Sequence, residues 1–264
     1  ARLDVNLEDT ENSLKASRVY LEQDYQLLSS KDSANQKDFT NLKVGHVLAS
    51  SKKAYEFSQN SPSNFIGATN FSGNIKDDVN YTFLKNQFFL EFNSKYVLGT
   101  FKAKSSIMSY SYGYDKIINQ TSDINTRKLK GSAISFGADW KAKVSKFQLD
   151  ATGEITPGSA RLAGANLQGN LSYKKDSLFD IKASVLLNSK SPNFNYLLHQ
   201  STYDAYNWKN DFENIRTQNL GFQVDSRWLN AVVNLTNIEN YTYFGEDNKP
   251  QQYTDNVTYL KVKA

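Results

Sequence analysis

The sequence predicts an all-β protein, a transmembrane antiparallel up-and-down β-barrel. We expect about 13 strands in this chain and about 14 or more in the complete barrel. Three observations support this prediction. Apolar and polar residues alternate with a period of two, short turns alternate with longer polar loops, and aromatic residues gather near both ends of the predicted strands.

Composition excludes several classes of protein. The 264 residues include no Cys and two His, so a disulfide framework, a Cys-ligated metal and an iron–sulfur cluster are excluded, and we expect no metal site and no cofactor. The net charge of +4 comes from scattered basic residues, which gives no support for a nucleic-acid partner. No apolar run is long enough for a membrane-spanning helix.

The alternation of residue types is clearest after residue 146. Phe147, Leu149 and Ile155 are apolar, while Gln148 and Thr152 between them are polar. Such a pattern predicts strands with one apolar and one polar face, because successive side chains of a strand point to opposite sides. Similar apolar faces occur at Val19, Leu21, Tyr25 and Leu27, at Ile134, Phe136, Ala138 and Trp140, at Leu167, Leu171 and Tyr173, at Phe179, Ile181, Ala183, Val185 and Leu187, at Leu220, Phe222 and Val224, and at Leu229, Ala231, Val233 and Leu235.

The connections between strands differ at the two ends. Short turns are predicted near residues 11–13, 51–53, 93–95, 141–143, 174–176 and 225–227. Longer polar loops are predicted at 29–37, 59–78, 115–126, 156–160, 190–207 and 245–253. Outer-membrane barrels have short periplasmic turns and long outer loops. The odd strand count then leads us to expect that residues 1–264 form a single outer-membrane β-barrel domain that is an incomplete portion of a longer chain.

Aromatic residues are expected to form two girdles at the membrane surfaces, where amphipathic rings are favoured. The girdle near the short turns would contain Trp140, Phe147, Tyr173, Phe179 and Trp228, and the girdle near the long loops would contain Tyr110, Tyr112, Tyr241 and Tyr243. General enrichment of aromatic residues in strands is the simpler explanation, but it does not account for placement at both ends.

The polar face would line an aqueous lumen if the apolar face meets lipid. Its candidate lumen-lining residues are Lys102, Lys104, Lys146, Asp150, Glu154 and Lys182. These charges could select among solutes. Alternatively, they hydrate the lumen or pair with charges on neighbouring strands.

No catalytic site is predicted. His46 and His199 could suggest an outer-membrane hydrolase, but neither lies near a recognisable nucleophile motif. Asp77 with Asp78, or Glu246 with Asp247, could hold a loop calcium ion, although solvated acidic residues are the more common case.

Three segments carry a resemblance to a known family. They are KDFTNLKVGH (residues 37–46), LGTFKAKSSIMSYSYGY (98–114) and YNWKNDFENIRTQNLGFQVDSRWLNAVVNLTNIENYTYF (206–244). Together they resemble the putative porin family of Gram-negative outer-membrane barrels. The resemblance implies a β-barrel in the bacterial outer membrane, with outer-membrane lipid as its surroundings, and a transport role. The terminal aromatic residue usual in such barrels is absent, because this sequence ends in Lys263 and Ala264.

Two functions from different classes follow for a membrane barrel. The first is a porin-type, non-enzymatic protein that admits small solutes passively through its lumen. The second is a non-conducting accessory or structural subunit, with partner proteins in a larger outer-membrane complex. A soluble β-rich binding protein with a second sheet over the apolar face is a third possibility.

Overall fold

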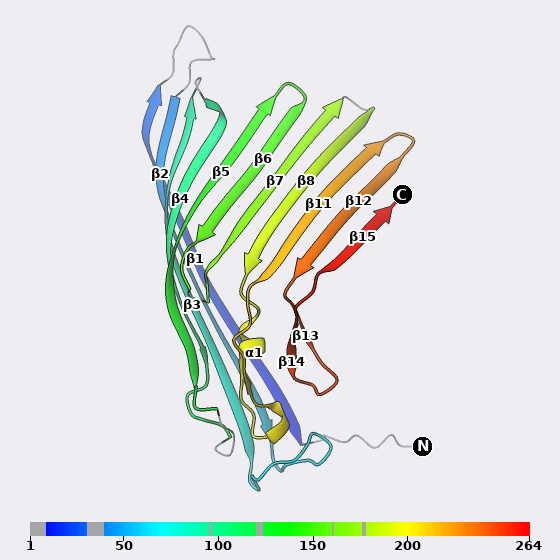
Figure 1. Ribbon diagram of the computed structural model, residues 1–264. Helices are drawn as coiled ribbons and strands as arrows, with labels where there is room; N and C mark the ends of the chain where they lie inside the picture. The colour runs from blue at the N-terminus through cyan, green and yellow to red at the C-terminus, as the bar shows by residue number, and fades with distance from the viewer. Residues whose placement is uncertain (1–8, 31–39, 95–96, 120–123, 160, 176–177) are drawn as a thin grey trace.

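The computed structural model describes residues 9–30, 40–94, 97–119, 124–159, 161–175 and 178–264 (Figure 1). Eleven strands form one antiparallel sheet in which each strand pairs with the next sheet strand along the chain. These strands are β1 (Thr10–Ser30), β2 (Thr40–Gln59), β3 (Ile75–Ser94), β4 (Val97–Gly113), β5 (Lys128–Val144), β6 (Phe147–Thr156), β7 (Gly164–Lys175), β8 (Phe179–Lys190), β11 (Ile215–Ser226), β12 (Asn230–Glu239) and β15 (Val257–Lys263).

The remaining elements are short and lie in the connections. After β8 come α1 (Phe194–Leu197), β9 (Leu198–His199), the 3₁₀ turn η1 (Asp204–Tyr206) and β10 (Trp208–Lys209), in which β9 pairs with β10. After β12, a separate hairpin is formed by β13 (Tyr241–Phe244) and β14 (Pro250–Tyr253). Among the described residues, no helix has both the length and the apolar character needed to cross a membrane.

The sheet curls into a trough, as Figure 1 shows. An ion pair across the sheet reflects this curvature. Lys85 Nζ on β3 lies 3.8 Å from Glu154 Oε1 on β6, although β4 and β5 lie between these two strands. Adjacent strands are about 4.8 Å apart, so side chains three strands apart meet most readily on a concave face. The described strands do not close into a barrel, because β1 and β15 each pair on one side only.

The two faces of the sheet differ in chemistry, which confirms the predicted alternation. On the convex face, apolar residues lie opposite one another on neighbouring strands, as Ile107 does to Ile134 and Leu167 to Leu187. Many of these side chains are exposed, including Leu84, Phe88, Leu90, Phe101, Ile134, Phe136, Ile155, Leu171, Leu220, Phe222, Val233, Leu235, Leu260 and Val262. No second sheet covers this face among the described residues, unlike the core of a soluble sandwich.

The first five strands are longer than the rest. They contain 17 to 21 residues, whereas β6, β7, β8, β11 and β12 contain 10 to 12. In β5, Phe136 pairs with Ile155 near the end of β6, so the earlier residues of β5 extend past β6 at the long-loop end. About ten residues suffice to cross a bilayer. The first five strands are therefore longer than a bilayer crossing requires, and we call this extra length the extended wall.

Several predicted boundaries are wrong. Residues 11–13 and 51–53 are not turns but lie within β1 and β2, where Ser51 pairs with Arg18, so eleven strands replace the expected thirteen or so. These polar residues resemble a turn in sequence. They lie in the extra length of β1 and β2, where a strand does not need an apolar face. The predicted turn at 141–143 belongs to β5, and the actual turn is Ser145 and Lys146, with Ser145 at a φ of 53°.

The predicted loop at 29–37 overlaps β1 and residues outside the described ranges. The alternation of short and long connections predicts this loop at the long-loop end of the strands. Because β1 and β2 are uninterrupted, the strand ends that flank it lie instead at the end that carries the short turns (Figure 1).

A charge on the convex face should destabilise the protein in lipid. We expect Leu167→Arg to lower the free energy of unfolding from phospholipid vesicles by about 2–4 kcal/mol, because the charge would lie in hydrocarbon. Its matched control is Gln168→Arg, since Gln168 is the next residue of β7 and is exposed on the concave face. Equal urea midpoints for the two variants would contradict the assignment of the faces.

Candidate functional site

The connection between β8 and β11 folds over the concave face, beside the long strands (Figure 1). We call residues 191–214, which contain α1, β9, η1 and β10, the inward segment. The most completely buried large side chains of the described residues lie in this segment or against it, namely Ile75, Tyr114, Leu197, Leu198, Gln200 and Tyr203. The most buried side chains therefore lie where a connection packs on the sheet, and not in a core between two layers.

Asp77 of β3 anchors the inward segment to the wall. Its carboxylate accepts hydrogen bonds from the hydroxyl of Ser201 at 2.9 Å, from the backbone N–H of Thr202 at 2.9 Å and from the hydroxyl of Thr202 at 2.6 Å. Asp77 is 7% exposed. Hydrogen bonds to a buried charged group are among the stronger ones, so this carboxylate is a principal attachment point.

Two further side chains join the inward segment to other strands and loops. The hydroxyl of Tyr203 donates to Gln59 Oε1 at 2.5 Å and accepts from the backbone N–H of Ser63. The side chain of Gln200 accepts from the N–H of Ile118 at 2.9 Å and donates to the carbonyl of Thr126 at 2.8 Å. The segment is thereby tied to the connections on both sides of β3 and β4.

His199 is part of the packed interior of the inward segment. Its ring stacks on Trp208 at a centroid distance of 4.5 Å and meets Tyr114 edge-on. Nδ1 lies 2.7 Å from the carbonyl oxygen of Tyr206, which assigns the ring proton to Nδ1 in the neutral form. Burial lowers the pKa of His199 below its ordinary value of 6.5, and the hydrogen bond to Tyr206 and the charge of Asp77 offset this only in part.

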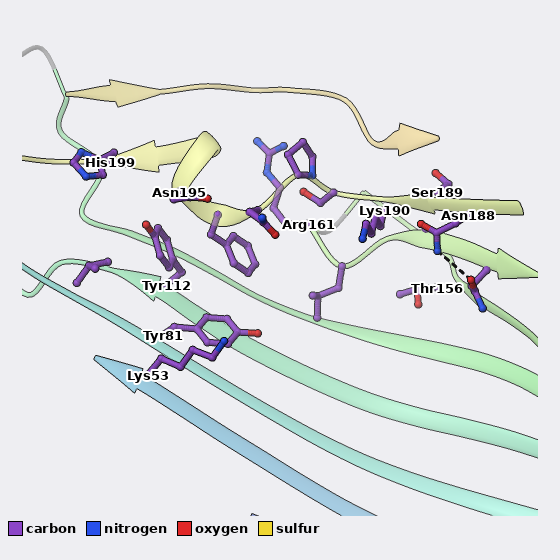
Figure 2. Close-up of a pocket in the computed structure, with 18 of the residues that line it drawn as sticks. Lys53, Tyr81, Tyr112, Thr156, Arg161, Asn188, Ser189, Lys190, Asn195 and His199 are labelled. Carbon is purple, nitrogen blue, oxygen red and sulfur yellow. Dashed lines mark hydrogen bonds between the residues drawn. The ribbon is translucent and has the colours of Figure 1, made fainter. Parts of the chain in front are cut away.

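A cavity of about 860 Å³ lies between the inward segment and the wall (Figure 2). Lys53, Tyr81 and Tyr112 line it from β2, β3 and β4, while Lys190 and Asn195 line the opposite side. Its volume falls within the range of small-molecule sites. The cavity combines aromatic rings, amides and basic side chains.

Ion pairs neutralise much of the concave wall away from this cavity. Lys102 pairs with Glu91 at 3.3 Å, and Lys104 pairs with Asp139 at 2.6 Å. The side chain of Lys104 crosses Gly137, where an added Cβ would lie 3.2 Å from Lys104 Cε, and its Nζ also lies 3.5 Å from Thr152 Oγ1 on β6. The glycine leaves room for a cation that connects three strands.

The predicted lumen-lining residues, with one exception, lie on the concave face. Their strand positions place Lys102, Lys104, Asp150, Glu154 and Lys182 on that face. Lys146 does not share it and lies in the turn between β5 and β6. Lys182 lies 3.9 Å from Asp180, and Asp150 accepts a hydrogen bond from Gln148. Several of these charged residues thus pair with neighbours along or across strands, which is the alternative to solute selection given above.

The aromatic residues near the short turns lie close together at that end of the sheet, and their role as a girdle stays a prediction. Phe147 contacts Tyr173 at 4.7 Å, and Tyr173 contacts Phe179 at 6.1 Å. Trp140 lies on the same convex face and donates from Nε1 to the carbonyl of Leu98. Trp228 is in a turn and is 77% exposed.

The residues of the other predicted girdle lie elsewhere. Tyr110 and Tyr112 point to the concave face, where each stacks against Phe194 of the inward segment, at 4.9 and 5.4 Å. Tyr241 and Tyr243 stack on each other in the β13–β14 hairpin, outside the eleven-stranded sheet. The sequence predicted rings at strand ends but could not distinguish lipid contact from contact with a folded loop.

The residues considered for catalysis or metal binding are separated or engaged elsewhere. His46 lies on the convex face of β2, with its ring 4.8 Å from Phe88, whereas His199 lies over the concave face. Asp77 anchors the inward segment, and Asp247 accepts from the N–H of Lys249. Among the described residues, no group of three or more His, Cys, Asp or Glu side chains could hold a metal ion.

The sequence predicts the inward segment only as an outer loop at 190–207. Its length was the available signal, because connections of this size within a compact structure are commonly functional. Its contacts join residues more than 120 positions apart, as Asp77 and Thr202 are, and no local pattern predicts them.

Weakening the Asp77 attachment should loosen the inward segment. In Asp77→Asn, the amide NH₂ would face hydrogen-bond donors, and we expect a loss of about 1–3 kcal/mol in the stability of docking. Hydrogen exchange at the Thr202 amide should accelerate accordingly. Asp78→Asn is the matched control, since Asp78 is on the opposite face of β3, and exchange that is equally slow in all three proteins would contradict the anchoring role.

Acid should loosen the same segment through His199. Well above pH 6.5 the ring is neutral whether the segment is docked or not, so its ionisation has no effect on docking. As the pH falls through 6.5, the undocked ring takes up a proton first, and docking weakens. The protection factors of the segment's amides, in which the intrinsic pH dependence of hydrogen exchange is removed, should therefore decrease as the pH is lowered from 7 to about 5. His199→Phe should abolish this decrease, and an unchanged pH dependence of the protection factors in that variant would contradict the assignment.

Comparison with known proteins gives a family for the whole chain. No curated protein matches the sequence. A family described as "Putative porin" matches residues 1–264, which confirms the resemblance carried by the three shorter segments. The match agrees with an all-β, up-and-down antiparallel sheet that has an exposed apolar face and a polar face. The chain belongs to this porin family.

Proposed function

We propose that the protein is a porin of the bacterial outer membrane that admits small hydrophilic solutes passively, with the inward segment narrowing the route. The observation that carries this proposal is the cover over the polar concave face. The inward segment lies over that face at the long-loop end, while the apolar face is turned outward. A porin needs a polar passage with a narrower part, and a polar face covered by a folded segment supports both.

Passage also requires a closed barrel. In lipid, the backbone N–H and C=O groups at the free edges of β1 and β15 need partners, because hydrocarbon offers none. We propose that further strands close the sheet between these edges. The eleven described strands would then form most of the wall, and the five predicted concave-face charges would border the lumen without taking part in any reaction.

Conductance in a planar bilayer tests the proposed passage. Full-length protein should form open channels, and replacing residues 194–206 with a short Gly-Ser linker should raise the single-channel conductance, because the obstruction over the concave face is removed. The matched control shortens the hairpin tip at residues 245–249, which lies outside the sheet, and should leave conductance unchanged. Folded protein that conducts neither with nor without residues 194–206 would contradict the proposal.

A non-conducting subunit of a larger outer-membrane complex is the second candidate. The observation in its favour is the same inward segment, whose many hydrogen bonds make it a firm cover as well as a suitable constriction. Native purification distinguishes the two candidates when it is combined with the conductance measurement. Stable partner proteins together with absent conductance would favour the subunit.

A further inference from the structure

We propose that the cavity beneath the inward segment binds a small solute that carries a carboxylate on a ring, such as a sugar acid or an aromatic acid. The inference deepens the proposed function, because it names the class of solute that the passage would favour. The inference rests on the proposed porin function only for the route by which the solute would reach the cavity. The cavity itself is lined by described residues of β1 to β4, of β6 to β8, of the connection between β6 and β7, and of the inward segment.

One side of the cavity is an aromatic surface. The ring of Phe194 lies 5.4 Å from that of Tyr112, at an interplanar angle of 18°, and 5.8 Å from that of Tyr81. All three side chains line the cavity. Their mutual contacts hold the rings in place, so a flat or ring-shaped solute could pack against them with little loss of side-chain freedom.

Basic side chains surround this surface. Lys53 and Lys190 are exposed to the cavity, and neither has an ion pair or a hydrogen bond with another described residue. Arg161 pairs with Asp211, but the carboxylate of Asp211 is 92% exposed, so water competes for that contact. Figure 2 shows Lys53 on the wall side and Arg161 and Lys190 on the other side.

The acidic groups of the cavity do not cancel this charge. Glu154, which also lines the cavity, accepts a hydrogen bond from Ser135 at 2.8 Å and lies 3.8 Å from Lys85. Its charge is therefore already compensated by the wall. Elsewhere on the concave face, Lys102 and Lys104 are each paired with an acid. The cavity thus differs from the paired wall in offering lysines that are free to meet an anion.

Amide side chains complete the polar lining. Asn193 and Asn195 are exposed at the cavity, and each can both donate and accept hydrogen bonds. Beside them, the hydroxyl of Ser191 is buried without a hydrogen-bond partner among the described residues. Such groups suit the hydroxyls of a sugar, while the aromatic surface also suits a benzene ring. The chemistry shared by both ligands is a carboxylate attached to a ring.

Calorimetric titration of the purified full-length protein in detergent tests the proposal. The probes are galacturonate and benzoate, with galactose and benzyl alcohol as their uncharged counterparts. We expect at least one acid to bind at least about tenfold more tightly than its neutral counterpart, because only the acid meets the cations. Binding of galacturonate alone would identify a sugar acid, and binding of both acids would identify ring carboxylates in general.

Variants locate the binding in the cavity. Lys53→Gln with Lys190→Gln should weaken acid binding about tenfold and abolish most of the preference over the neutral probe. Lys130→Gln is the matched control, since Lys130 is an exposed lysine that does not line the cavity, and it should change nothing. Tyr81→Leu should weaken acid and neutral probes alike.

Two results would overturn the inference. They are acid affinities no higher than those of the neutral probes, and acid affinities unchanged in the double lysine variant when that variant remains folded by circular dichroism. Because binding is measured in detergent, it is independent of conductance. If the protein binds the acid but forms no channel, the binding site is supported and the proposed passage is contradicted.

Discussion

The structure depends on one sheet being in contact with two different media. Successive side chains of a strand alternate between faces, so one chain can present Leu167 to the convex side and Gln168 to the concave side without any second layer. The hydrogen bonds between strands satisfy the backbone on both sides of each inner strand. Curvature then gathers the polar side chains together, and this is why charges three strands apart, such as Lys85 and Glu154, can pair.

A sheet with this arrangement has no apolar core between layers, so close packing has to arise elsewhere. It arises where the inward segment meets the long strands, around Tyr114, Leu198 and Tyr203. The extra length of β1 to β5 has a structural reason in this setting. Residues such as Gln59 and Asp77, near the ends of those strands, hold the segment by hydrogen bonds that shorter strands could not reach.

Local pattern was enough to predict the faces but not the contacts between distant residues. The alternation from Phe147 to Ile155 follows from strand geometry alone, so those strands and their faces were predictable. The run around Ser51 resembles a turn in sequence but lies within β2, because polar residues suit both a turn and a strand segment beyond the apolar zone. The position of Tyr112 depends on Phe194, 82 residues away, and period-two alternation carries no information about that contact.

The same reasoning explains where charge is available on the concave face. In the middle of the wall, neighbouring strands bring acids and bases into register, so a lysine such as Lys104 finds Asp139 and contributes little net field. Near the long-loop end, the cavity lies between Lys53 of β2 and Lys190 of β8, and neither lysine has an acidic partner among the described residues. These two lysines face the cavity and its aromatic rings instead of a carboxylate partner. The folded connection encloses these two lysines in a cavity, and on this ground we propose a cationic site in one part of the wall.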